Sequence, residues 1–285
     1  MSDAVRQAAQ LLAEHDVPSP ETDAIALAAH VVGCDPAELH RRMVLGDAVP
    51  ADWDRFEELV AERARRIPLQ HLTGRAGFRR LELAVGPGVF VPRPETELTA
   101  ELAIAAAHET SRAVVVDLCT GSGAIALSVK DEVPLAQVYA VELSPEAHAW
   151  ALQNRERTGL DVELRLGDAA IAFPELAGRV DVVVCNPPYI PEGMVPTEPE
   201  VRDHDPELAL YGGSLDGLAV PLALAARAAD LLRDEGALVM EHADVQGTWL
   251  PDALERAGVW REVADHKDLT GRPRVVTAHR VPRDG

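Results

Sequence analysis

The chain has 285 residues, enough for one large domain or two smaller ones. Its composition, 47% hydrophobic and 26% charged residues, is ordinary for a folded protein and excludes a disordered, collagen-like or disulfide-rich chain. Charge is the unusual quantity, because 27 Lys and Arg face 47 Asp and Glu, which gives a net charge of −20. Such a surface repels phosphate backbones, so nucleic acid is not expected as the main ligand.

The three cysteines, Cys34, Cys119 and Cys185, lie far apart and form no CxxC pair, so neither a zinc site nor a disulfide framework is predicted. No pair of the ten histidines has the spacing of a metal-binding motif. The first ten residues carry charges and no apolar core, unlike a signal peptide, and no apolar run is long enough to span a membrane. We therefore expect a cytoplasmic protein without a bound metal.

Short helices are predicted for about the first 66 residues. Ser19 followed by Pro20 is typical of a helix start, because Ser caps the first turn and Pro fits its first position. Asp35 marks another start, with Glu38 placed to complete a capping box. A further helix ends in the basic run from Arg63 to Arg66. We interpret this run as a solvated helix end and keep an anion site as the alternative.

The pattern changes after Pro68. Between Leu81 and Val85, apolar side chains alternate with others, as in a half-buried strand. A Gly-Pro-Gly turn at residues 86–88 follows, and the segment Val89–Val91 is predicted to return as the hairpin partner. We therefore predict a hairpin connector over residues 76–95.

Strand and helix signals alternate from Ala113 onward. Continuous apolar runs are expected of strands that are covered on both faces. These runs are residues 114–116, 138–141, 180–184 and 237–240. Their alternation with helical stretches predicts an α/β fold with a doubly wound sheet. The chain is thus divided into a helical domain over residues 1–75, the connector, and an α/β domain over residues 96–285.

The first strand of the α/β domain leads into a loop that contains an acid and two glycines, from Asp117 to Gly123. Ligands of open α/β sheets bind outside the carboxyl ends of the strands. Gly121 and Gly123 let a ligand approach the backbone closely. Cys119 occupies the first glycine position of the dinucleotide fingerprint, so a ligand without a pyrophosphate is favoured. A tight turn without a ligand is the alternative.

Two further acids follow the next strands. Glu142, at the tip of the second strand and 25 residues after Asp117, suits a bidentate hydrogen bond to a ribose diol. Asp168, after the third strand, suits a hydrogen bond from an exocyclic adenine amine. Either acid alone is typical of a solvated loop, but acids at three successive strand ends favour a nucleoside pocket.

The most specific signal is Asn186-Pro187-Pro188-Tyr189, which directly follows the fourth strand. The prolines fix the backbone and leave rigid carbonyl groups. Asn186 adds a side-chain acceptor, and Tyr189 adds a flat aromatic face. Two oxygens and a ring suit a planar NH₂ group, whereas a turn that merely ends a buried strand is the less favoured interpretation.

The acidic glycine loop, Glu142, Asp168 and Asn-Pro-Pro-Tyr occur in the order found in class I S-adenosylmethionine-dependent methyltransferases that act on planar amide or amine nitrogens. Further segments resemble the release factor glutamine methyltransferases, so the resemblance covers nearly the whole chain. These segments are Pro68–Gly74, Phe78, Val91–Glu97, Asp205–Leu210, Gly212–Gly213 and Asp268–Arg272.

The resemblance implies a Rossmann-like class I methyltransferase sheet and a small helical N-terminal domain that recognises the substrate. It further implies that S-adenosylmethionine is the cofactor and that the glutamine of the Gly-Gly-Gln motif in bacterial peptide chain release factors is methylated at its amide nitrogen. The cofactor contacts it assigns are Asp117, Cys119, Thr120, Gly121, Ser122, Gly123, Glu142, Asp168, Ala169 and Asn186. The substrate contacts it assigns are Asn186, Pro187, Pro188 and Tyr189, of which Asn186, Pro187 and Tyr189 are catalytic.

The chain departs from the family pattern at Cys119 and Arg80, where glycine is common, and at Ala169, where an aromatic residue is common. Two other functions are considered. A DNA adenine N6-methyltransferase would also use Asn-Pro-Pro-Tyr for an extruded base, but the charge of −20 and the lack of a basic recognition domain count against it. The intact tetrad argues against a non-catalytic adaptor. We expect a monomer that binds release factors but neither nucleic acid nor membranes.

Overall fold

The computed structural model describes residues 1–47 and 50–283. The chain folds into two compact units. Unit 1 consists of Met1–Arg75 together with Pro196–His204, and unit 2 consists of Ala76–Val195 together with Asp205–Gly285. The segment Pro196–His204, which the sequence pattern places in the α/β domain, therefore folds with the N-terminal helices.

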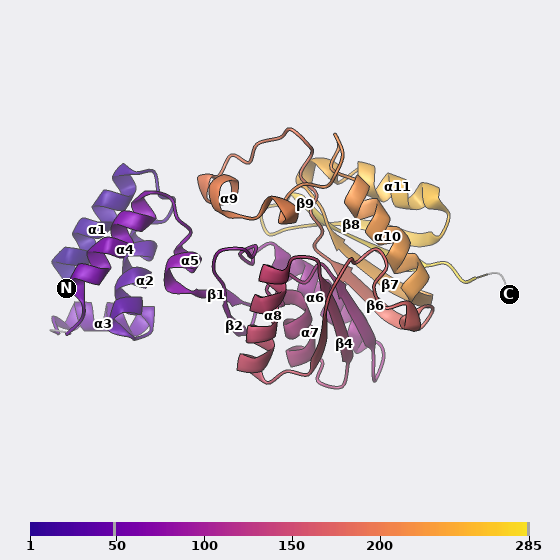
Figure 1. Cartoon of the computed structure of the whole chain (residues 1–285), viewed down its shortest axis with the longest axis horizontal. Helices are drawn as coiled ribbons and strands as arrows, with labels where there is room; N and C mark the ends of the chain where they lie inside the picture. Colours follow the sequence, from indigo (N-terminus) through magenta and orange to yellow (C-terminus); the bar gives the residue numbers. More distant parts are fainter. Residues whose placement is uncertain (48–49, 284–285) are drawn as a thin grey trace. The chain divides into compact units, whose positions relative to one another are not determined.

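Unit 1 is helical (Figure 1). Its helices are α1 (Ser2–Glu14), α2 (Pro20–Val32), α3 (Pro36–Leu45), α4 (Trp53–Ala64), α5 (Leu69–Thr73) and α9 (Pro199–His204). Pro20 is the first residue of α2, as predicted, and the Asp35 side chain accepts a hydrogen bond from the backbone two residues later at 2.7 Å. The Glu38 carboxylate was expected to complete a capping box, but it binds Arg41 and Arg42 instead.

The core of unit 1 forms where the apolar faces of α1 to α4 meet. Its largest fully buried side chains are Leu12, Leu27, Leu39, Phe56 and Leu59. Burying a side chain of this size stabilises a fold by about 1.5–3 kcal/mol relative to leaving it in water. Short helices are only marginally stable on their own. Because these apolar residues lie on one face of each helix, the helices can pack together and become stable.

The basic run at the end of α4 is not a solvated helix end, so that interpretation was wrong. Arg63 is only 5% exposed, and its Nε donates to Asp23 Oδ2 at 2.7 Å while its Nη2 lies 2.8 Å from Glu200 Oε1. Arg66 Nη2 donates to Glu200 Oε2 at 2.7 Å. Burial raises the pKa of Glu200, but the hydrogen bonds from the two arginines outweigh burial and hold the pKa at about 2. One ion network therefore joins α2, α4 and α9.

Unit 2 contains a seven-stranded sheet with the strand order β5-β4-β3-β6-β7-β9-β8. Its strands are β3 (Val114–Leu118), β4 (Gln137–Glu142), β5 (Val162–Leu166), β6 (Val180–Cys185), β7 (Leu232–Glu241), β8 (Trp260–Lys267) and β9 (Pro273–Arg280). The first five strands of this order are parallel, whereas β9 is antiparallel to both of its neighbours. The predicted apolar runs all lie in strands, and the α/β class is confirmed.

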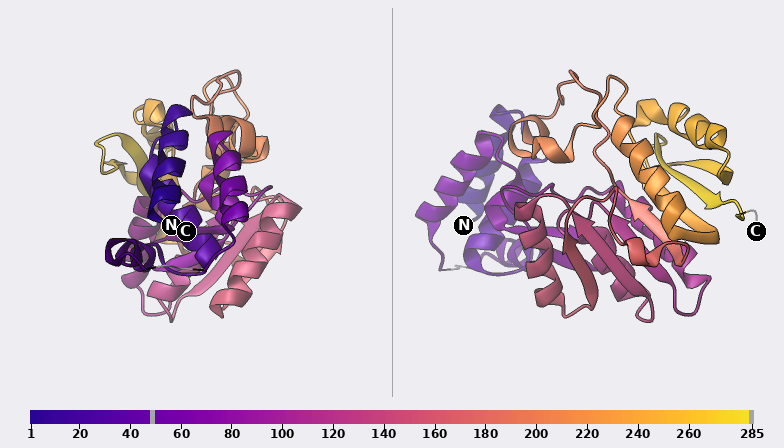
Figure 2. Two further views of the ribbon diagram at one scale, coloured as in Figure 1. Left: turned by 90° about the vertical axis from the view of Figure 1, so that its left-hand side faces the viewer. Right: turned by 45° about the vertical axis from the view of Figure 1, so that its right-hand side comes forward.

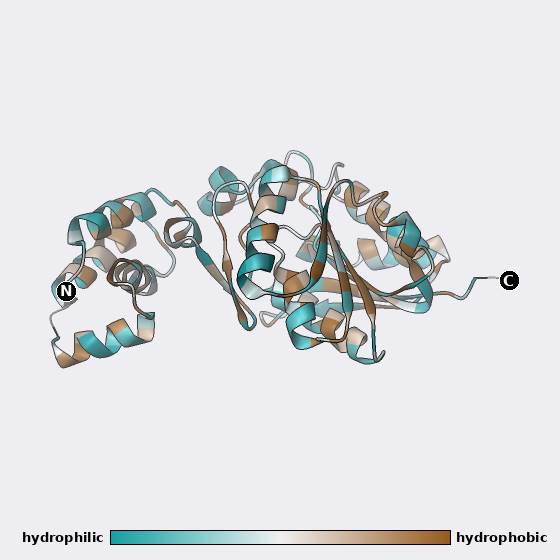
Figure 3. Cartoon of the chain, turned by 60° about the horizontal axis from the view of Figure 1, so that its bottom comes forward, coloured by the Kyte–Doolittle hydropathy of each residue, from teal (hydrophilic) through white to brown (hydrophobic). Residues whose placement is uncertain are grey.

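Helices cover both faces of the sheet (Figure 2). The helices of unit 2 are α6 (Thr96–His108), α7 (Ala124–Glu132), α8 (Pro145–Thr158), α10 (Ala219–Leu231) and α11 (Trp249–Ala257), and the 3₁₀ turns are Pro174–Leu176, Glu207–Ala209 and Asp244–Gln246. One buried cluster packs α6 and α7 against the strands, and a second cluster packs α10 and α11 on the other face. The central strands β3 and β6 are accordingly almost entirely buried, and brown predominates in the middle of the sheet in Figure 3. None of the helices that the structure describes is long and apolar enough to cross a bilayer.

A two-stranded hairpin connects the helical region with the large sheet. It pairs β1 (Arg75–Phe78) with β2 (Leu81–Ala84), so the predicted partner strand at Val89–Val91 was wrong. The valines of the latter segment are buried against Ala147 of α8 instead, and Trp150 Nε1 donates to the carbonyl oxygen of Pro87 at 3.2 Å. Side-chain packing on α8 thus takes the place of strand pairing after the Gly-Pro-Gly turn.

Candidate active site

The predicted site residues meet at one edge of the large sheet. Leu118 is in register with Val141, and Asp117 with Val184, so β3 ends beside both β4 and β6. The chain leaves β3 toward β4 on one side, and β6 pairs with β3 on the other side. This is the switch point at which ligands bind in open α/β sheets. Glu142, the last residue of β4, belongs to the same edge.

The loop after β3 has an unusual backbone. Cys119, Gly121 and Gly123 adopt φ angles of 93°, 57° and 86°, all in the region that favours glycine. Cys119, which has a Cβ, takes up this glycine conformation at a strain of about 1–3 kcal/mol. Thr120 and Gly123 close the turn through a backbone hydrogen bond of 2.8 Å. The N–H groups of Cys119 and Thr120 both donate to the Val141 carbonyl oxygen, at 3.1 Å and 3.0 Å, which ties the loop to the end of β4.

Glu142 organises this loop. Its Oε2 accepts a hydrogen bond from the N–H of Gly121 at 2.8 Å, and its Oε1 accepts one from the N–H of Ser144 at 2.8 Å. A carboxylate offers about four lone-pair positions, so two remain for a ligand. The predicted ribose-binding acid therefore also fixes the glycine loop against the end of β4.

Asp117 is fully buried at the end of β3. Its Oδ2 accepts a hydrogen bond from the Thr120 hydroxyl at 2.7 Å, whereas its Oδ1 has no hydrogen-bond partner among the described residues. Burial raises the pKa of Asp117 to about 7, against the opposite effects of the Thr120 hydroxyl and the Ala126 backbone N–H. An unsatisfied buried oxygen at a ligand-binding loop is a place for a donor that arrives with the ligand.

Two more predicted contacts lie after β5 and in the glycine loop. Asp168 is exposed, and its Oδ1 accepts from the N–H of Ala170 at 2.8 Å, while Ala169 is buried in the core of unit 2. The carbonyl oxygen of Ser122 accepts a hydrogen bond of 2.9 Å from Asn154 Nδ2. Asn154 on α8 is 1% exposed and was missed in the sequence, where a polar residue in a helix gives no signal of burial.

The tetrad after β6 is held from several sides. Asn186 Nδ2 donates to Thr96 Oγ1 at 3.3 Å, and Pro187 is buried. The backbone N–H of Tyr189 donates to the Leu210 carbonyl at 3.1 Å. The Tyr189 hydroxyl donates to Glu241 Oε1 at 3.3 Å, and burial raises its pKa. These contacts fix the ring and leave the Asn186 carbonyl oxygen available.

Gln246, also missed in the sequence, joins the tetrad to the loop before α10. It is fully buried, and its Nε2 donates to the carbonyl oxygens of Tyr189 at 2.9 Å and Asp216 at 2.8 Å. A Cβ on Gly217 would lie 2.1 Å from the Tyr189 carbonyl oxygen, so only glycine permits this approach. The double-glycine segment of the family resemblance ends four residues earlier, in this same loop.

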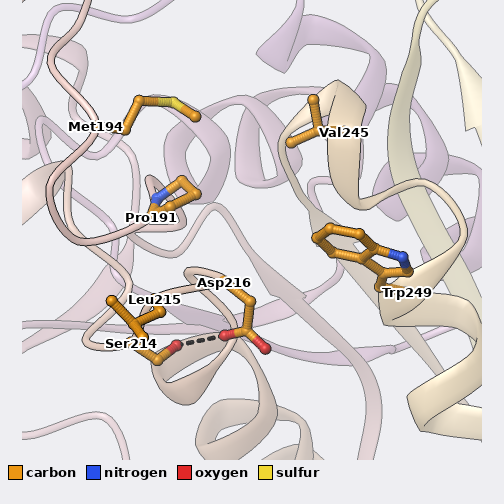
Figure 4. A pocket seen from close by; sticks show the side chains of 7 residues that line it. All are labelled: Pro191, Met194, Ser214, Leu215, Asp216, Val245 and Trp249. Atoms are coloured by element: carbon orange, nitrogen blue, oxygen red, sulfur yellow. Dashed lines mark hydrogen bonds between the residues drawn. The ribbon is translucent and has the colours of Figure 1, made fainter.

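An open hollow of about 670 Å³ lies in unit 2, and its lining begins at Pro191, two residues after the tetrad (Figure 4). Its walls are mostly apolar and come from the loops after β6 and β7 and from the start of α11. The lining residues are Pro191, Met194, Ser214, Leu215, Asp216, Val245 and Trp249. Ser214 Oγ donates to Asp216 Oδ1 at 2.6 Å, which closes one wall.

Two segments of the family resemblance meet in an ion pair. Arg93 Nη2 lies 2.7 Å from Asp205 Oδ2, although the residues are 112 positions apart. Arg93 precedes α6, and the Asp205 side chain is fully buried where the chain re-enters unit 2. The chain segment between the tetrad and Asp205 is therefore anchored at its end by this ion pair.

Known proteins resemble this chain along nearly its whole length. Residues 3–74 match the family described as the PrmC N-terminal domain, and residues 80–198 match the methyltransferase small domain. A release factor glutamine methyltransferase of Streptomyces coelicolor is 53% identical over 282 residues, with 97% of each chain covered. Another from Mycolicibacterium smegmatis is 48% identical over 281 residues, with 98% of each covered.

Among solved structures, a methyltransferase from Pyrococcus furiosus superposes with a TM-score of 0.51 at 21% identity, covering 71% of this chain and 90% of that one, and so shares the fold. The geometry at the switch point agrees with the relatives' activity, because a methyl donor and a planar amide need adjacent sites. The chain is a methyltransferase and belongs to the release factor glutamine methyltransferase family.

Proposed function

We propose that the enzyme transfers a methyl group from S-adenosylmethionine to the side-chain amide nitrogen of the glutamine in the Gly-Gly-Gln motif of bacterial peptide chain release factors. The observation that carries the proposal is the pairing of β3 with β6, which sets the acidic glycine loop beside Asn186–Tyr189. The names of relatives that are up to 53% identical support the choice of substrate.

The residues of the loop fit the cofactor. The unsatisfied Asp117 Oδ1 would accept from a donor of its amino acid part, Glu142 has lone pairs for the ribose hydroxyls, and Asp168 Oδ2 would accept from the adenine amine. Three carboxyl groups at this edge also suit a ligand with positive charge. When bound, S-adenosylmethionine supplies an electrophilic methyl group on a cationic sulfur.

The tetrad orients the amide. An amide nitrogen is a weak nucleophile, because its lone pair is delocalised into the carbonyl group. Asn186 Oδ1 and the Pro187 carbonyl oxygen would each accept one N–H of the glutamine, which turns the lone pair toward the methyl donor. As positive charge develops on the nitrogen, both acceptors bind it more strongly. Tyr189 would hold the amide plane, so the rate enhancement comes mostly from positioning, and the proton leaves after transfer.

The helical unit would hold the release factor. Unit 1 contains none of the predicted catalytic residues, yet α3 carries two large apolar side chains at its end, Val44 and Leu45, which are 74% and 61% exposed. Neighbouring exposed apolar residues of this size favour contact with another protein. We therefore assign protein recognition to this unit and methyl transfer to unit 2.

The proposal is tested by incubating the full chain with methyl-labelled S-adenosylmethionine and one of three acceptors. These are a release factor, the same factor with Ala in place of the motif glutamine, and duplex DNA. We expect label only in the first, on a tryptic peptide that contains Gly-Gly-Gln and is heavier by one methyl group. Label in DNA would identify an adenine methyltransferase instead, and cofactor binding without any labelled product would identify an adaptor.

A further inference from the structure

A buried carboxylate lies behind the tetrad. Glu241 is the last residue of β7 and is 1% exposed, and its neighbour Met240 is in register with Cys185, the residue before Asn186. Glu241 Oε2 accepts from the Thr99 hydroxyl at 3.0 Å, and Oε1 accepts from the Tyr189 hydroxyl at 3.3 Å. The sequence offered a signal for this residue, because it is a charge at the end of an apolar strand.

The charge on Glu241 determines which group donates in each hydrogen bond of the chain Asn186–Thr96–Glu241. The Thr96 hydroxyl lies near enough to the Glu241 carboxylate to lower its pKa as a hydrogen-bond donor, and an ionised carboxylate can only accept. A hydroxyl has a single hydrogen, so Thr96 has only lone pairs left for Asn186. Asn186 must then turn its NH₂ group to Thr96 Oγ1, at 3.3 Å, and its Oδ1 the other way. The orientation of the amide thus follows from the charge on Glu241.

We propose that Glu241 is a positioning residue for methyl transfer, which through Thr96 makes Asn186 present its carbonyl oxygen to the substrate amide and through the Tyr189 hydroxyl holds the aromatic ring. The inference rests on the proposed function, in which Asn186 Oδ1 accepts an N–H of the glutamine. Reversal of the Asn186 amide would place two N–H groups against the N–H groups of the substrate.

The charge state of Glu241 gives the inference a measurable pH dependence. Burial raises the pKa of Glu241 to about 7, while hydrogen bonds from Thr96 and Thr99 and the nearby Arg274 oppose the rise and Glu95 adds to it. The Tyr189 hydroxyl also faces this carboxyl group, and burial keeps it neutral.

Below the pKa, a protonated Glu241 can donate to the Thr96 hydroxyl. The Thr96 hydrogen is then free to point to Asn186 and to stabilise the reversed amide. Above the pKa, the carboxylate enforces the productive orientation. The wild-type kcat should therefore rise with pH through about 7 and level off above it.

The experiment measures single-turnover methylation of a release factor at saturating cofactor from pH 5.5 to 9, together with thermal unfolding and cofactor affinity. Glu241→Gln should lower kcat roughly tenfold or more, because a preorganised polar group is worth about 10²–10³ and only its orientation is lost. Its pH profile should be flat near 7, and KM should change little. Thr96→Val, which removes the hydroxyl and keeps the shape, should have a similar effect, and the double variant should be no slower than either single one.

Thr99→Val is the matched control, because Thr99 also donates to Glu241, whereas the side-chain partner of Asn186 among the described residues is Thr96. It should keep the plateau rate and shift the rise in kcat to higher pH, since the ionised carboxylate loses a donor. If Glu241→Gln does not fold, Thr96→Val carries the same test. Wild-type rates and pH profiles in both Glu241→Gln and Thr96→Val would overturn this inference and would leave the proposed function standing. A wild-type enzyme that does not methylate the release factor would overturn the proposed function and the inference with it.

Discussion

Replacing Glu142 by alanine tests the cofactor half of the site. Glu142 makes two charge-assisted hydrogen bonds to backbone N–H groups, at 2.8 Å to Gly121 and 2.8 Å to Ser144, and has lone pairs left for two ribose hydroxyls. Glu142→Ala removes both roles at once. Water can satisfy the N–H groups at this partly exposed edge, so we expect the variant to fold.

The expected loss of cofactor affinity in Glu142→Ala follows from the number and kind of hydrogen bonds that the ligand loses. Removing a charged acceptor from a pair of ligand hydroxyls costs about 1.5–3 kcal/mol. At about 1.4 kcal/mol per factor of ten, the dissociation constant should rise roughly 10- to 150-fold. Glu142→Gln keeps one acceptor oxygen and should lie between alanine and the wild type.

Titration calorimetry with S-adenosylhomocysteine, which cannot react, measures the affinity directly. A second ligand that lacks the ribose hydroxyls separates the two roles of Glu142. If the carboxylate binds the hydroxyls, the penalty of Glu142→Ala should shrink to a few-fold for this ligand, and if it only orders the loop, the penalty should be equal for both ligands. Glu146→Ala is the control, because it removes the same charge from an exposed position four residues away. Wild-type affinity in Glu142→Ala would exclude this residue from the site.

Three further expectations concern other parts of the molecule. Asn186→Ala should lower kcat by about 10²–10³ with a smaller change in cofactor affinity, and Asn186→Asp should retain part of the rate; wild-type single-turnover rates in the alanine variant would refute the mechanism. Cys119→Gly should relieve left-handed strain, stabilise the protein by about 1 kcal/mol and raise the thermal midpoint by about 2–4 °C; a lower midpoint would refute this reasoning. Replacing both Val44 and Leu45 by Asp should reduce kcat/KM for the release factor roughly tenfold without affecting cofactor binding, whereas Leu135→Asp, an equally exposed position before β4, should change neither.

The parts of the fold that local pattern decides were predictable. Each buried parallel strand is a continuous apolar run, so β3, β4, β6 and β7 could be found without a structure, and the acids at their ends follow from the rule for open α/β sheets. The structure brings Asp117, Glu142 and Asn186 to one edge, although their roles remain predictions.

The parts that depend on distant partners were not predictable. The sequence around Arg63 is the same whether its guanidinium faces water or Asp23, and the two residues are 40 positions apart. The hairpin prediction failed for a related reason, because Val89–Val91 has strand-forming residues but packs on α8. Gln246 acquires its importance only from the loops that the fold brings around it, and the charge of Glu241 at the end of an apolar strand does not identify Thr99 and Tyr189 as its partners.

The membership of α9 in unit 1 limits how this protein can be recombined with its relatives. Glu200 and the arginine that binds it in a bidentate manner are encoded 134 residues apart, and of the two only the arginine lies within the N-terminal family match, residues 3–74. A chimera that exchanges residues 1–75 alone would pair Glu200 with foreign side chains. If these side chains lack the arginines, the uncompensated Glu200 carboxylate lowers the free energy of unfolding by about 3–5 kcal/mol. The affected segment begins seven residues after the tetrad. Transplanting the helical unit therefore requires two inserted segments, residues 1–75 and residues 196–204, from the same parent.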